Sequence, residues 1–295
     1  MKNLLIFVMS LIFVQISNAQ IDTITVVYTH NTNGVLENCN CPVRSYGALE
    51  KRAALIDSIR HTNPKILLLD TGDILDIQKS TLLHQYVLMA YDYMKYDFWT
   101  PGDQDFVEGT SFFLNKLMRL SAQMVTSNIR YRESAIGQTF AIKKIGNIRV
   151  GITGTTREDL HKFLDSPAER DFQFENQLSA LGQVVHELSG KSDFLIVLSH
   201  SGIERDREIA KLYPEINLII GGHSQTILSQ PEKIAKTYIT QVGESGYRTG
   251  IFTIIFQNKK ILTTESKVVL LKKEMADNPA IVNMINHYHQ ERLAK

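Results

Sequence analysis

Residues 65–73 read KILLLDTGD, and residues 194–202 and 216–225 repeat the same plan as FLIVLSHSG and INLIIGGHSQ. Each stretch is a short apolar run that ends abruptly in glycine and polar residues. Such runs are typical of strands that are buried on both faces of a sheet. Helical patterns lie between them, for example at residues 81–96 and 178–188. This alternation predicts an α/β fold with a largely parallel sheet.

The same organisation continues in both directions along the chain. Further strands are expected at residues 21–28, 148–153, 237–241, 251–256 and 268–271, and further helices at residues 47–60 and 278–293. No repeat, low-complexity segment or linker interrupts the pattern. We therefore expect residues 20–295 to form a single domain.

The first nineteen residues have the pattern of a secretory signal peptide. Lys2 precedes an apolar run from Leu4 to Val14, and small residues at 17–19 offer a cleavage point before Gln20. The run is shorter than the roughly 20 apolar residues that span a bilayer. The sequence therefore predicts an exported chain, periplasmic or alternatively secreted, with no membrane span after processing.

The balance of charge argues against nucleic acid as a partner. Lysine and arginine number 32 against 31 acidic residues, which gives a formal net charge of +1, and no basic block stands out. Nucleic-acid binding needs clustered positive charge to neutralise phosphates. A small-molecule partner is the better expectation.

Polar clusters follow the carboxyl ends of the predicted strands, where ligands bind in open α/β sheets. The clusters are residues 31–34 (NTNG), 72–73 (GD), 102–106 (GDQDF), 200–202 (HSG) and 221–225 (GGHSQ). Each cluster alone is a weak signal, but their order and shared position are specific.

This series of clusters resembles the calcineurin-like metallophosphoesterases, and most of all the catalytic domain of 5′-nucleotidases. Those proteins carry Asp-x-His-Gly, Gly-Asp, Gly-Asn-His-Glu-Phe, a lone His and Gly-Gly-His-Ser-His in the same order. The resemblance covers roughly residues 22–270. It implies a four-layer α/β/β/α sandwich with mixed sheets and a metal site at the carboxyl ends of the strands.

The resemblance also implies which residues would hold metal ions. One site would use Asp73, Asp103, His200 and His223, which all remain able to bind a metal. This set suits one transition-metal ion, Zn, Mn or Fe.

The other site is degraded. Asn31, Asn33 and Gln225 stand where the family has Asp, His and His. Neutral amides give only weak support for a second ion. Random drift would be expected to alter both sites, so the sequence favours one retained site over none.

Gln104 stands where the family has the histidine that follows Asn. As a predicted catalytic residue beside Asp103 and His200, it can donate a hydrogen bond to a phosphoryl oxygen. It cannot protonate a leaving group, because an amide has no titratable proton near neutral pH.

The two cysteines, Cys39 and Cys41, follow the first cluster. In an oxidising compartment a disulfide is expected, although a Cys-x-Cys ring is strained and more reducible. A redox role and thiolate ligation of a metal stay open as alternatives. A subset of the family has a similar cysteine pair and degraded motifs, and we expect the pair near the mouth of the site.

The sequence thus predicts an exported, metal-dependent phosphoesterase that acts on a small phosphorylated substrate, with activity reduced if only one metal remains. No C-terminal specificity domain of the nucleotidase type is expected in 295 residues, so nucleotide specificity does not carry over. The alternatives are a non-catalytic, metal- or ligand-binding or redox-linked module, and a subunit completed by a partner protein.

Overall fold

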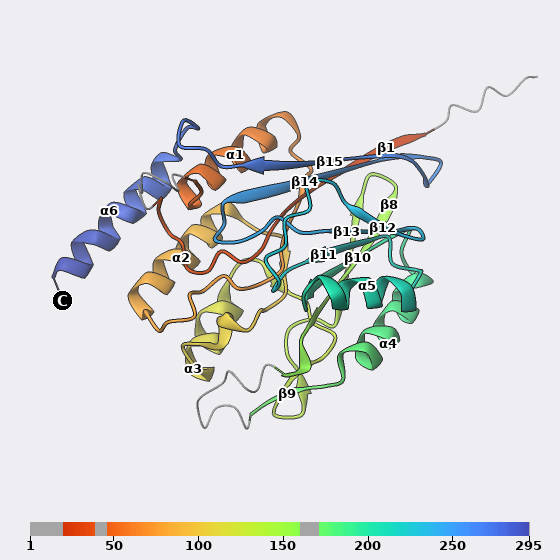
Figure 1. Cartoon of the computed structure of the whole chain (residues 1–295), viewed down its shortest axis with the longest axis horizontal. Coiled ribbons are helices and arrows are strands. Elements are labelled where there is room, and N and C mark those ends of the chain that lie inside the picture. Colours follow the sequence, from red (N-terminus) through yellow and green to blue (C-terminus); the bar gives the residue numbers. More distant parts are fainter. Residues whose placement is uncertain (1–19, 39–45, 160–170, 295) are drawn as a thin grey trace, which may run out of the picture.

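The computed structural model describes residues 20–38, 46–159 and 171–294. Two six-stranded sheets form its centre (Figure 1). The first sheet has the spatial order β15 (Lys260–Leu270), β14 (Arg248–Gln257), β1 (Ile21–Thr29), β2 (Leu67–Asp70), β3 (Phe98–Trp99) and β4 (Gln123–Met124). The second has the order β12 (Glu232–Ile234), β13 (Thr237–Thr240), β11 (Leu218–Gly221), β10 (Phe194–His200), β8 (Ile148–Thr156) and β7 (Phe140–Ile145).

Each sheet combines a set of parallel strands with antiparallel strands at one or both sides. The strand pairs β1–β2–β3–β4 and β8–β10–β11–β13 are parallel, whereas β7, β12, β14 and β15 pair antiparallel. The β14–β15 hairpin turns at Asn258 and Lys259, both with positive φ, as a type I′ turn requires. The mixed sheets implied by the family resemblance are confirmed. Strand–helix alternation alone predicted a largely parallel sheet and did not indicate the antiparallel pairing of these outer strands.

Helices cover the outer face of each sheet. The helices are α1 (Leu49–Thr62), α2 (Thr81–Met94), α3 (Thr110–Asn115), α4 (Gln177–Ser189), α5 (Ile203–Leu212) and α6 (Pro279–Leu293), with short 3₁₀ turns η1 (Gln104–Phe106) and η2 (Leu117–Arg119). A small third sheet contains β6 (Ser134–Ala135), β5 (Ile129–Tyr131) and β9 (Phe172–Phe174). None of the described helices combines the length and apolarity needed to cross a bilayer.

Alternating side chains divide the core into three layers. Leu67 and Leu69 face the second sheet, whereas Leu68 between them packs among the side chains of α1, α2 and α6. In β10, Ile196 likewise faces the first sheet and Val197 faces α4 and α5. This period of two buries both faces of each central strand and produces the expected four-layer α/β/β/α sandwich.

Candidate functional site

The candidate metal site lies where the two sheets present the carboxyl ends of their parallel strands. The loops after β2 and β3 supply Asp73 and Asp103 from the first sheet. The last residue of β10, His200, and the loop after β11, with His223, come from the second. The structure brings all four of these side chains together.

The side chains of Asp103, His200 and His223 converge. Oδ1 of Asp103 lies 3.0 Å from Nε2 of His200 and 2.9 Å from Nδ1 of His223. One ligand atom from each residue lies within 4.8 Å of the others. A single cation could therefore contact all three with small side-chain adjustments.

Asp73 adds a second carboxylate, and a backbone carbonyl orients the ring of His200. Oδ2 of Asp73 is 3.3 Å from His200 Nε2. On the other side of the ring, Nδ1 lies 2.5 Å from the carbonyl oxygen of Thr71. Nδ1 therefore donates to that carbonyl, which leaves Nε2 directed at both carboxylates, the usual arrangement behind a metal-bound histidine.

Asp103 and His200 favour each other's charged forms. Burial alone lowers the pKa of the His200 imidazole, but the carboxylates of Asp73 and Asp103 raise it well above its usual value. Burial raises the pKa of Asp103, and the two imidazoles outweigh this effect and hold it well below its usual range. Two carboxylates and two imidazoles fit a divalent transition metal.

Two of the three amide residues assigned by the sequence to a degraded second site, Asn31 and Asn33, contact residues of this cluster. Asn31 donates from Nδ2 to Asp73 Oδ2 at 3.0 Å and accepts the backbone N–H of His223 at 3.1 Å. The backbone N–H of Asn33 donates to the Asp73 carbonyl at 2.8 Å. Its buried Oδ1 has no hydrogen-bond partner among the described residues. Gln225 follows His223 by two residues on the same loop.

The backbone of these loops is bent into an unusual conformation. Five non-glycine residues here have φ between 47° and 68°: Asn31, Asn33, Asp73, His223 and Gln225. Left-handed backbone is uncommon for residues with a Cβ, and such positions gather at functional sites. All five are residues that the sequence predicts to form the metal site or its degraded neighbour.

Gln104 also contacts the cluster. Its backbone N–H donates to Asp73 Oδ1 at 3.0 Å, and its Nε2 donates to Asp73 Oδ2 at 3.2 Å. The side chain thus lies within hydrogen-bonding distance of a carboxylate of the cluster. Its predicted role as a hydrogen-bond donor remains a prediction.

Asp105 fastens the two carboxylate-bearing loops together, and the sequence analysis had assigned it no role. Its two oxygens accept the backbone N–H groups of residues 73, 74, 75 and 102 at 2.8–3.2 Å. Burial and, to a lesser extent, the nearby Asp73 raise the pKa of Asp105 to about 7, although His200 and the backbone donors oppose the rise. These four hydrogen bonds, here called the clamp, hold the loop of Asp73 against the loop of Asp103.

We expect Asp105→Ala to lower the free energy of unfolding by about 2 kcal/mol, because it leaves buried N–H groups without an acceptor. Metal affinity should fall about tenfold or more, since the clamp supports ligand geometry. Urea unfolding and metal titration measure both effects. Asp92→Ala is the control, because Asp92 is exposed and, within the described residues, accepts one backbone N–H, that of Ser121. Equal stability losses in the two variants would contradict the clamp.

Arg157 is a second functional candidate that the sequence analysis missed. It follows β8 directly, and its Nη1 donates to Nε2 of His223 at 2.6 Å. Asp159 pairs with the same guanidinium through Nε at 2.8 Å. A basic residue directly after a strand end was the available signal, and the structure shows that it lies at the cluster.

Cys39 and Cys41 lie outside the described residues, so their expected position at the mouth of the site and their bonding stay predictions.

A family model for calcineurin-like phosphoesterase matches residues 29–226, which contain every cluster residue named above. The chain is 24% identical over 305 residues to the 5′-nucleotidase of Bos taurus, covering 90% of this chain and 52% of that protein. It is 24% identical over 295 residues to the snake venom 5′-nucleotidase of Naja atra, covering 88% and 55%. The chain therefore spans about half the length of the curated relatives it matches.

Solved structures show the same fold. The 5′-nucleotidase precursor from Thermus thermophilus superposes with a TM-score of 0.81 at 24% identity, over 92% of this chain and 59% of that one. The calcineurin-like phosphoesterase YfkN from Bacillus subtilis superposes with a TM-score of 0.77 at 17% identity, over 93% and 99%. By the extent of the family match, the chain belongs to the calcineurin-like phosphoesterases, a family that implies divalent metal ions.

Proposed function

We propose that this protein is a metal-dependent phosphoesterase that hydrolyses small phosphate monoesters of the 5′-nucleotidase type. One transition-metal ion, Zn, Mn or Fe, would be held by Asp73, Asp103, His200 and His223. The observation that carries the proposal is the convergence of two carboxylates and two imidazoles at the carboxyl ends of the strands. When bound, such a cation acts as a Lewis acid on a phosphoryl oxygen and on water.

The protein's own groups then position the phosphoryl group. Gln104 Nε2 lies 3.2 Å from Asp73 and can donate a hydrogen bond to a phosphoryl oxygen. The guanidinium of Arg157, which is paired with Asp159, lies 2.6 Å from His223 and can donate its remaining N–H groups to a phosphoryl oxygen. Fixed donors aimed at a phosphoryl group stabilise the charge that develops during transfer.

Export to the periplasm is part of the proposal and rests on the signal-like pattern of residues 1–19. We also propose that residues 20–295 form one domain. The middle core layer supports this, because side chains of both six-stranded sheets pack into it.

The deciding experiment is elemental analysis of the purified protein together with a hydrolysis assay on a panel of phosphate mono- and diesters. About one metal ion per chain with monoester hydrolysis is the expected result. One bound metal without hydrolysis of any ester would overturn the enzyme and leave the binding module. A protein that binds no divalent metal would overturn both.

Restoring the family residues should create a second metal site. We expect the triple variant Asn31→Asp, Asn33→His, Gln225→His to raise the metal content from about one to about two ions per chain. Turnover should increase about tenfold, because two ions can clamp both the attacking and the leaving oxygen. Elemental analysis and steady-state kinetics provide the readout, and unchanged stoichiometry in a folded variant would refute the two-site interpretation.

Arg157→Met should raise KM for a phosphate monoester about tenfold, the loss expected for one charge-assisted hydrogen bond. The melting temperature should change little, because the side chain of Arg157 is 35% exposed and its ion pair is with Asp159, only two residues later in the chain. Arg205→Met is the matched control, since Arg205 pairs with Glu208 on α5. An unchanged KM with a lowered melting temperature would show that Arg157 is structural only.

A further inference from the structure

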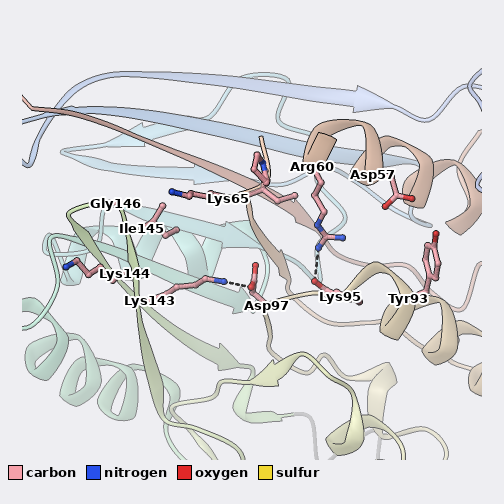
Figure 2. Close-up of a pocket in the computed structure, with 12 residues that line it drawn as sticks. Asp57, Arg60, Lys65, Tyr93, Lys95, Asp97, Lys143, Lys144, Ile145 and Gly146 are labelled. Atoms are coloured by element: carbon pink, nitrogen blue, oxygen red, sulfur yellow. Dashed lines mark hydrogen bonds and ion pairs between the residues drawn. The ribbon is translucent and has the colours of Figure 1, made fainter. Parts of the chain in front are cut away.

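A hollow lies at the amino-terminal ends of strands β2 and β3, opposite the metal cluster (Figure 2). Its volume is about 890 Å³, within the range of small-molecule sites. Lys65 and Ile66 precede β2, and Asp97 precedes β3. Ile145 ends β7, and Gly146 begins the turn to β8. Because β2 and β3 end at the carboxylates of the metal cluster, this hollow, here called the basal cavity, is separate from that cluster.

Positive charge predominates in the basal cavity. Five cationic side chains line it, Arg60, Lys65, Lys95, Lys143 and Lys144, against the two carboxylates of Asp57 and Asp97. The formal charge of the whole chain is only +1. The cavity therefore concentrates positive charge that the rest of the surface does not share.

Both carboxylates already have partners. Asp97 forms an ion pair with Lys143 and accepts the N–H of Leu68 at 2.8 Å. Asp57 accepts a hydrogen bond from Asn278 Nδ2 at 2.7 Å. The two acids thus help to hold neighbouring elements together, and only one of the five cations is paired with them.

The other four cations keep their charge available. Arg60 donates to the carbonyl oxygens of Met94 and Lys95 at 2.6 and 2.8 Å, which fixes the guanidinium without neutralising it. Within residues 20–38, 46–159 and 171–294, no ion pair includes Lys65, Lys95 or Lys144. A fixed guanidinium with three nearby lysines forms a receptor for a multiply charged anion.

The walls of the cavity indicate the size and chemistry of that anion. Arg60 and Lys65 lie on one side of the hollow, and Lys143 and Lys144 lie on the other (Figure 2). Ile145, together with Ile66 next to Lys65 in the chain, provides apolar contact, whereas Tyr93 lies beyond Arg60 beside Asp57. This arrangement suits a compact organic polyanion better than an extended nucleic acid or acidic peptide.

We infer that the basal cavity binds a small molecule that carries two or more phosphate groups. The site is independent of the metal cluster and of the proposed hydrolysis. Its phosphates would contact Arg60, Lys65 and Lys144, and its organic part would lie against Ile66 and Ile145.

Isothermal titration calorimetry with inorganic pyrophosphate, on metal-free protein in low salt, tests this inference. Removing the metal keeps pyrophosphate from chelating it. We expect one site per chain, whose dissociation constant rises at least about tenfold in Lys65→Glu/Lys144→Glu, because two charged contacts become repulsive. The control Lys236→Glu/Lys267→Glu changes two exposed lysines outside the cavity by the same charge and should bind like the wild type.

Three results would overturn the inference. These are no binding up to millimolar pyrophosphate, an equal loss in both double variants, and a loss caused by Asp103→Asn rather than by the cavity variants. Circular dichroism monitors folding. If the double variant unfolds, Lys65→Gln and Lys144→Gln are tested singly, and unchanged affinity in both would likewise reject the site.

Discussion

His200→Ala should lower phosphoesterase turnover by at least about a hundredfold and reduce metal content from about one ion per chain to below a tenth of that. His200 is fully buried and lies within 3.3 Å of Asp73 and 3.0 Å of Asp103. Its removal leaves two carboxylates facing each other with one imidazole. Loss of a group that only supports a ligand costs 10- to 100-fold, so loss of the ligand itself should cost more. Elemental analysis and kcat of the same sample measure both quantities.

His186→Ala is the matched control for this experiment. His186 is exposed on α4, with no part in the cluster, and its removal should leave metal and turnover unchanged. If His200→Ala kept its metal and its activity in a folded protein, the assignment of the metal site would be wrong.

Arg52→Met should lower the free energy of unfolding by about 3–5 kcal/mol at pH 8, the loss expected when one partner of a buried charge network is removed. Arg52 is fully buried and donates to Tyr91 Oη at 3.0 Å. Tyr91 in turn donates to buried Asp70 at 3.0 Å. Methionine would leave the carboxylate of Asp70 without the positive charge that now compensates it.

The loss should shrink in acid. Burial raises the pKa of Asp70 to about 6 from its ordinary 3.8, although Thr29 and Arg52 oppose the rise. A carboxyl whose pKa is higher in the folded state makes stability fall as pH rises from about 4 to 6. Without Arg52 the folded-state pKa rises further, so this fall continues to higher pH. Urea unfolding at pH 5 and pH 8 should therefore give a smaller difference from wild type at pH 5.

Arg130→Met provides the comparison. Arg130 forms an ion pair with Glu175 at 2.6 Å, but both side chains are more than a third exposed. Its replacement should cost less than about 1 kcal/mol at either pH. Equal losses for the two variants would mean that the Arg52 network contributes nothing beyond a surface pair.

The strands beside the site could be predicted because burial on both faces leaves a clear apolar run. KILLLD predicts a strand that the structure shows as Leu67–Asp70, and FLIVLS predicts Phe194–His200. The last strand was predicted only at residues 268–271, yet β15 begins at Lys260. Its first half reads KILTTES and lies largely exposed at a sheet edge, where polar residues hide the pattern.

The site was predictable only where its residues follow strand ends in a known order. Asp73, Asp103, His200 and His223 met that condition, and the structure brings them together. The role of Asp105 depends on N–H groups some thirty residues earlier in the chain, which no local pattern reveals. Arg157 becomes a candidate site residue through its contact with His223, 66 residues later in the chain, which the local sequence does not reveal.

The division of the four proposed ligands between two sheets has a consequence for how a metal ion would enter the site. Asp73 and Asp103 lie in the first half of the chain, and His200 and His223 lie in the second. Of these four ligands, the first half supplies only carboxylates, which on their own hold transition metals weakly. The complete ligand set would therefore exist only once the second sheet has docked on the first. An ion bound there would join the two halves of the molecule as a non-covalent cross-link.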